Sequence, residues 1–322
     1  MVDINNSEYW RARNQERSQI KEQLNREDGY SKEIRQLYRD TRDEVNREIQ
    51  SSIYQFADDE GLSIKEARKK IDSFDVEQFQ NRVAKYINDD NLSPKGKQVL
   101  NNFNVSMRTS RLELLNKRIG IETVRLADAE EAITREILEK EAILELERQA
   151  GIHEQSLPDG EQLQSMVKTI VDAEFHNQTF DDRIWDNQRE LQKRLESTIK
   201  GTILQGKSPL DGVKQLRELV NEKEFSNASY AARRLAITET ARVQTTTQEE
   251  SYKENDFEQY MFIAEPTACD DCAELDGEIF KVEDMEPGTN APTMHPFCKC
   301  STVAHYDSTE LDAELDRINE SG

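Results

Sequence analysis

The chain has 322 residues, of which 35% are hydrophobic and 34% are charged, and its formal net charge is -22. This composition is poor in core-forming side chains for a compact globule and favours long helices with solvated faces. The charge excludes a general affinity for nucleic-acid phosphates and for anionic membranes. No stretch approaches the roughly 18–20 apolar residues needed to span a bilayer, so we expect no membrane partner.

Residues 1–150 predict an extended N-terminal arm of amphipathic helices. The first residues, Met1 to Asn6, have neither the basic flank nor the apolar region of a signal peptide, so we expect the protein to stay in the cytoplasm where it is made. In the second predicted helix, apolar residues recur at steps of three, four and seven on one stripe: Ile34, Tyr38, Val45, Ile49, Ile53 and Phe56.

A further long helix of the arm is predicted from Ile121 to Gln149, a stretch without proline or glycine. Its apolar residues Leu126, Ile133, Ile137 and Leu144 return to one side of the helix. Such a stripe packs either within the chain or against another chain. A sustained heptad register would favour a second chain, but the sequence lacks one, so packing within the chain is favoured.

Residues 151–257 predict a central helical domain, because the glycine- and proline-containing stretch 151–160 marks a boundary. Its helices are expected near 161–174, 181–204, 209–222 and 229–250. In residues 258–307 the periodicity changes, and short runs at 260–263 and 278–282 predict a small β ribbon. Residues 308–322 are expected to form an exposed helix or tail. The fold class is therefore mainly α with a small C-terminal β subdomain.

All four cysteines lie in the predicted ribbon, together with a histidine. Cys269 and Cys272 form a C-x-x-C, and His295, Cys298 and Cys300 follow in H-P-F-C-K-C. Thiolates and imidazoles from two separate stretches are the ligands that structural zinc prefers. Five donors compete for four positions, and His295 and Cys300 contest the fourth because neighbours one residue apart bind one ion less easily than residues spaced by two.

Other uses of the cysteines fit the sequence less well. A zinc deaminase needs H-x-E upstream and a proline before C-x-x-C, but Ala268 precedes Cys269 and Glu154 directly follows His153. H-E-x-x-H is absent from the sequence. Disulfides are disfavoured in a reducing compartment, and a thiol redox pair needs a thioredoxin-like βαβ context. The sequence therefore predicts structural zinc and no enzymatic activity.

Two helical segments of the central region carry further candidates. Ile184 and Trp185 are expected in the core. The segment from Arg233 to Arg242 has two alternative interpretations: a solvated face with ion pairs, or a basic patch facing a partner or DNA, with contacts from Arg233, Arg234 and Arg242.

The order of these motifs resembles the head-morphogenesis domain of MuF-like phage minor head proteins, from about residue 160 to 305. The motifs that carry the resemblance are F-D-D-R-I-W at 180–185, R-L-A-I-T-E-T-A-R at 234–242, C-D-D-C-A-E-L-D-G at 269–277 and H-P-F-C-K-C at 295–300. The resemblance implies a virion protein bound to the portal inside the capsid, acting in head assembly and delivery of the packaged genome, without a small-molecule substrate. It carries the zinc site over to Cys269, Cys272, His295, Cys298 and Cys300. The alternatives are a metal-dependent enzyme acting on nucleic acid and a DNA-binding module.

Overall fold

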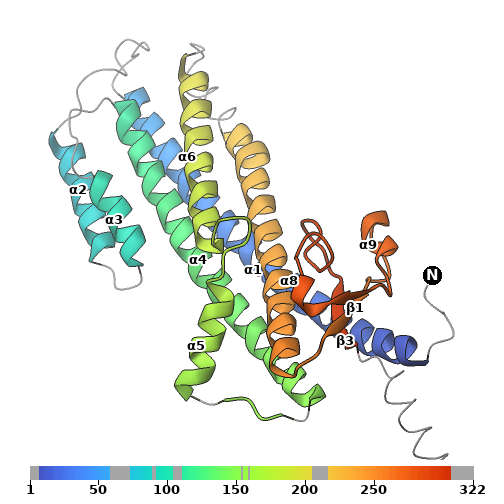
Figure 1. Cartoon of the computed structure of the whole chain (residues 1–322). Helices are drawn as coiled ribbons and strands as arrows, with labels where there is room; N and C mark the ends of the chain where they lie inside the picture. Colours follow the sequence, from blue (N-terminus) through green and yellow to red (C-terminus); the bar gives the residue numbers. More distant parts are fainter. Residues whose placement is uncertain are drawn as a thin grey trace, which may run out of the picture. The chain divides into compact units, whose positions relative to one another are not determined.

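The computed structural model describes residues 7–58, 73–88, 92–103, 111–153, 155–158, 160–204 and 217–305. These residues are mainly helical and end in a small antiparallel sheet, which confirms the predicted fold class (Figure 1). Among the described residues, no helix combines the length and the apolarity that a bilayer-crossing segment needs. The helices are α1 (Ser7–Asp58), α2 (Ser73–Ile87), α3 (Pro94–Phe103), α4 (Arg111–Ile152), α5 (Gly160–Val171), α6 (Phe180–Leu204), the π-helix η1 (Val220–Phe225), α8 (Ser226–Glu254), α9 (Asp270–Glu274) and the 3-10 helix η2 (Val282–Asp284); the strands are β1 (Gln259–Ile263), β2 (Ile279–Lys281) and β3 (Ser301–His305).

The chain forms two compact units from segments that are far apart in the sequence. The helical unit comprises the described residues of 30–134 and 178–233, and the sheet unit those of 1–29, 135–177 and 234–322. The long helices α1, α4 and α8 each contribute residues to both units. The predicted division into 1–150, 151–257 and 258–307 follows the sequence order and stays a prediction, and the predicted tail from 308 lies outside the described residues.

The helical unit is built on the predicted apolar stripe of α1. Ile34, Tyr38, Val45 and Ile49 are all buried, as the helical spacing indicates, whereas the side chains of the other two stripe members lie outside the described set. Long-range polar contacts join the helices of this unit. The hydroxyl of Tyr38 donates to Glu130 of α4 at 2.6 Å.

Two further contacts fix α2 and α6 in the helical unit. The guanidinium of Arg82 on α2 contacts Glu48 of α1 and donates to Glu122 of α4 at 2.6 Å. Trp185 of α6 is buried, as expected, and its indole N–H donates to Glu131 at 2.7 Å. A buried tryptophan needs such a partner for its N–H.

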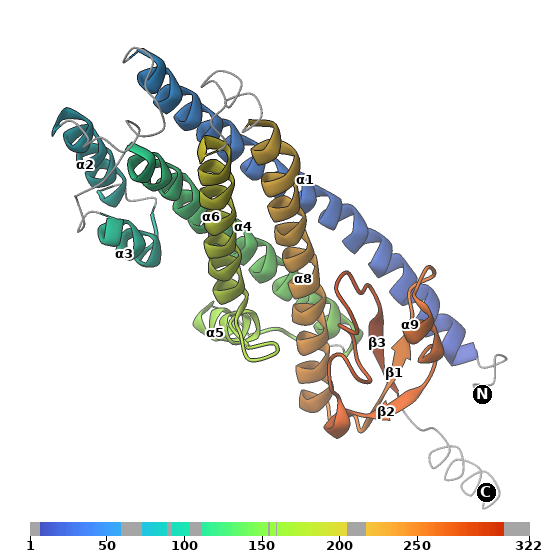
Figure 2. The same cartoon turned by 90° about the horizontal axis from the view of Figure 1, so that it is seen from above.

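The sheet unit has β1 at the centre of a three-stranded sheet. β2 and β3 both pair with it in antiparallel fashion, with Tyr260 opposite Phe280 on one side and Ala304 on the other. Figure 2 shows the sheet beside the C-terminal half of α8. The apolar sequence of β1 is fully buried from Tyr260 to Ile263, as a central strand requires.

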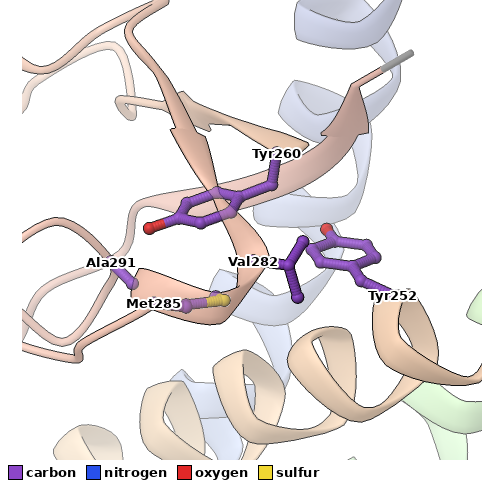
Figure 3. Close-up of a cluster of buried hydrophobic side chains, with 5 residues drawn as sticks. All are labelled: Tyr252, Tyr260, Val282, Met285 and Ala291. Carbon is purple, nitrogen blue, oxygen red and sulfur yellow. The ribbon is translucent and has the colours of Figure 1, made fainter. Parts of the chain in front are cut away.

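The two faces of β1 serve different clusters, because successive side chains of a strand point to opposite sides. Met261 and Ile263 pack with Val303 of β3. Tyr260 packs with Tyr252 of α8, and their rings are stacked at 6.4 Å. Figure 3 shows this cluster, which also contains Val282, Met285 and Ala291. Phe262, two positions further along the same face, packs on the buried cysteines.

Several element predictions are confirmed within small boundary shifts, and others are not. The expected helices near 161–174, 181–204 and 229–250 correspond to α5, α6 and α8, and the two expected strands correspond to β1 and β2. The helix expected at 209–222 lies partly outside the described residues; from Arg217 the chain is helical and continues through η1 into α8. The sequence did not predict β3 or α9.

Candidate metal centre

One half of the candidate centre is held at the start of α9. Cys269 is the residue that precedes this helix, and Cys272 lies in its first turn, so both thiols are near one helix end. Two hydrogen bonds tie this loop to β1: Gly277 N–H donates to the Phe262 carbonyl at 2.8 Å, and Ala264 N–H donates to the Asp276 carboxylate at 3.0 Å. The C-x-x-C is thereby fixed at the end of the central strand.

The other half is the segment that leads into β3. His295 and Cys298 lie in irregular backbone closed by a hydrogen bond from Cys298 N–H to the His295 carbonyl at 3.0 Å. Cys300 directly precedes Ser301, which pairs with Ile263 of β1. The end of β1 therefore lies next to both cysteine segments.

The five predicted donors form two overlapping groups. The ligand atoms of Cys269, Cys272 and His295 lie within 4.8 Å of one another, and so do those of Cys272, Cys298 and Cys300. Nε2 of His295 is 3.2 Å from the sulfur of Cys269 and 3.4 Å from that of Cys272. Cys272 belongs to both groups, so the two halves meet at its sulfur.

Burial and hydrogen bonding strongly perturb the thiols. The backbone N–H of Cys272 lowers the pKa of the exposed Cys269 thiol, whereas burial raises the pKa of Cys272. A hydrogen bond with the Cys300 thiol lowers the pKa of Cys298 to about 6, and the same contact raises the pKa of Cys300. When a metal ion binds, it displaces the protons of its thiol ligands. Closely spaced thiols with hydrogen bonds to one another are therefore an arrangement typical of a metal-ligand set.

The histidine is oriented as a ligand. Its Nδ1 lies 2.9 Å from the carbonyl oxygen of Pro296, and this hydrogen bond raises the pKa of His295. Donation from Nδ1–H to that carbonyl leaves the lone pair of Nε2 directed at Cys269 and Cys272. Metal-bound histidines typically make such an outer contact, which fixes the tautomer.

The donor set fits zinc by its chemistry. Thiolate sulfur and imidazole nitrogen in a tetrahedral shell are typical of structural zinc, and three of the four thiols are buried. Cys269, Cys272 and Cys298 remain the firmest of the predicted ligands. The structure groups His295 with Cys269 and Cys272, and Cys300 with Cys272 and Cys298, so both remain candidates for the fourth position.

The structure corrects the expectation for Arg242. Its side chain is buried, donates to Glu239 at 2.6 Å, and donates to the carbonyl oxygens of Ile170 and Val171 at 2.9 Å each. These two carbonyls lie at the C-terminus of α5, where backbone acceptors lack helical partners. Arg242 therefore joins α8 to α5, and it neither forms a solvated ion pair nor faces a partner.

The other two arginines reach the surface. Arg234 is exposed on α8. Arg233 is half-buried, donates to the Ser229 carbonyl at 3.3 Å and lies over the ring of Tyr230 at 5.9 Å from its centroid. Contact of Arg233 and Arg234 with a partner stays a prediction.

Comparison with known proteins identifies the region that contains the centre. Residues 187–303 match the family model described as Phage Mu protein F like protein. This region of the chain is similar to that family. The Mu F-like region begins within α6, contains α8 and all five metal donors, and ends within β3, inside the range expected from the motifs. No significant match was found among curated proteins or among solved structures.

The similarity of residues 187–303 to this family supports a structural role in phage head morphogenesis.

Proposed function

We propose that this chain is a minor head protein, bound to the portal inside the capsid, whose Mu F-like region is held together by one structural zinc ion. The observation that carries the proposal is that Cys272 belongs to both groups of neighbouring donors, which together comprise five sulfur and nitrogen donors within the region that matches the family. Zinc joins α9 to the segment before β3, two stretches that contribute few other apolar side chains.

The proposed zinc is structural because the protein supplies enough donors to close its shell. A catalytic zinc keeps one position open for water or substrate, whereas four protein ligands fill a tetrahedral site. We therefore propose no enzymatic role. Incubation of the zinc-loaded protein with labelled DNA and divalent cations tests this point: we expect intact DNA, and cleavage that is lost in His295→Ala would establish the nuclease alternative instead.

The proposed partners are the portal protein and, locally, the packaged DNA. With a net charge of -22 the chain cannot hold DNA over its whole surface, so DNA contact is confined to positions such as Arg233 and Arg234. Acidic surfaces disfavour stable DNA binding, which suits a protein that is enclosed with a genome and then releases it.

The proposal is tested by capture on the portal. Tagged portal protein should retain the chain, and mass spectrometry of procapsids and virions should detect it in low copy. Arg234→Glu should weaken capture if this surface is used, whereas Lys253→Glu, which reverses an exposed charge on the same helix, should not. Reproducible absence of the chain from procapsids and from portal complexes would contradict the proposal.

A further inference from the structure

Within the sheet unit, the N-terminal part of α1 is held to the other segments mainly by polar contacts. Among the described side chains of residues 14–29, those that are buried are Glu16, Ile20, Gln23 and Glu27, at steps of four, three and four on one helix face. Ile20 is the single apolar member of this set. Burial of apolar surface therefore contributes little here, and specific polar partners decide whether the segment stays docked.

These partners come from α4 and from the segment that carries the metal donors. Glu16 pairs with Arg148 of α4 at 2.6 Å and accepts a hydrogen bond from the Ser301 hydroxyl at 2.8 Å. Glu27, which is 3% exposed, faces the ammonium group of Lys299 at 3.5 Å. In Figures 1 and 2 the blue N-terminal part of α1 runs beside the sheet.

Lys299 and Ser301 differ in what holds them in place. Ser301 is the first residue of β3 and is anchored by its pairing with Ile263. Lys299 lies between Cys298 and Cys300 in backbone outside the three strands, so its position depends on the two flanking thiol donors as well as on the start of β3. The contact between Glu27 and Lys299 is therefore the one that depends directly on the centre.

We propose that occupancy of the metal centre controls the docking of residues 14–29 of α1, with Lys299 and Glu27 as the connecting pair; the inference rests on the proposed metal site. When the ion leaves, Cys298 and Cys300 lose their common anchor, and Lys299 is no longer held against α1. Glu27 then becomes a buried carboxylate without its cation, a state that strongly favours undocking of the helix. Because such coupling is reciprocal, a docked α1 also strengthens metal binding by the same factor.

The test is amide hydrogen exchange of the full chain, read out by mass spectrometry, with zinc content measured in parallel. Removal of zinc should accelerate exchange in residues 20–29 by at least about tenfold, since local opening follows the loss of these contacts. Lys299→Met leaves every donor in place, so it should retain zinc and show the same acceleration. The double variant, Lys299→Met with Glu27→Gln, should show slow exchange again, because it buries no unpaired charge. The matched control is Lys281→Met, which changes an exposed lysine of β2 in the same sheet that pairs with the exposed Glu283.

Glu27→Gln alone measures the reciprocal effect without altering the cysteine segments. It should lower zinc affinity, measured by competition with a chromogenic chelator, by several-fold, whereas Lys21→Gln on the exposed face of α1 should not. Unchanged exchange in zinc-loaded Lys299→Met, together with an unchanged zinc affinity of Glu27→Gln, would overturn the coupling and leave the zinc site standing. If the chain takes up no zinc, both the coupling and the proposed zinc site are wrong.

Discussion

A single buried carboxyl group in the helical unit should make its stability depend on pH. Glu130 is 2% exposed, and its partner is the hydroxyl of Tyr38 at 2.6 Å. Burial raises the pKa of Glu130 from 4.5 to about 7, although the Tyr38 hydrogen bond opposes the shift. The change we consider is Glu130→Gln, which keeps the shape and cannot ionise.

The magnitude follows from linkage. Between pH 4.5 and about 7 the carboxyl group is ionised in the unfolded chain and protonated in the folded chain, so unfolding releases a proton. The free energy of unfolding therefore falls as the pH rises through this window, by about 1.4 kcal/mol per pH unit and about 3 kcal/mol in total. Glu130→Gln removes this loss, so the variant should gain up to about 3 kcal/mol relative to the wild type between pH 4.5 and pH 8.

Urea denaturation followed by tryptophan fluorescence measures the effect, because Trp185 belongs to the same unit. Burial also raises the pKa values of Glu16, Glu27 and Glu122, so the wild type alone will show a larger pH dependence of the same sign. The quantity to compare is the difference between variant and wild type at each pH. A difference that stays constant from pH 4.5 to 8 would refute the reasoning.

Further substitutions test the packing of both units by calorimetry. Gly96→Ala should lower stability by about 1 kcal/mol, because a Cβ at this position would lie 2.7 Å from the Asp128 carboxylate that accepts the Ser93 N–H. Gly29→Ala, where nothing lies within 4 Å, should instead stabilise α1 by about 0.5–1 kcal/mol, and equal effects at the two glycines would contradict the contact. Arg242→Met should cost about 3 kcal/mol or more, because Glu239 loses a buried charge-assisted hydrogen bond and two α5 carbonyls lose their donor. Arg234→Met on the exposed side of α8 should change stability by less than about 0.5 kcal/mol.

Helical periodicity was sufficient to predict the parts of the fold that bury apolar stripes. Ile34 and Ile49 are buried on α1 where their spacing indicates, and α8 begins three residues before the expected helix. β3 escaped prediction because its first residues, Ser301 and Thr302, are buried against polar groups and show no apolar alternation. Thr302, for example, donates to Gln248 at 2.7 Å.

The candidate site was predictable as a set of residue types but not as a network. Cysteine and histidine spacing identifies the donors, since few other uses explain that pattern. Spacing carries no information about Lys299 or about Ser301, which meets Glu16 across 285 positions of sequence. For the same reason Arg242 could not be recognised as buried: its partners at Ile170 and Val171 come from another helix.

The most direct test of the account is metal analysis of the purified chain combined with X-ray absorption spectroscopy at the zinc edge. We predict about one zinc per chain, with three or four sulfur ligands at about 2.3 Å and any remaining position filled by imidazole nitrogen at about 2.0–2.1 Å. A chain that lacks zinc, or a zinc ion that keeps a water oxygen in its shell, would contradict the claim that these donors close a structural site.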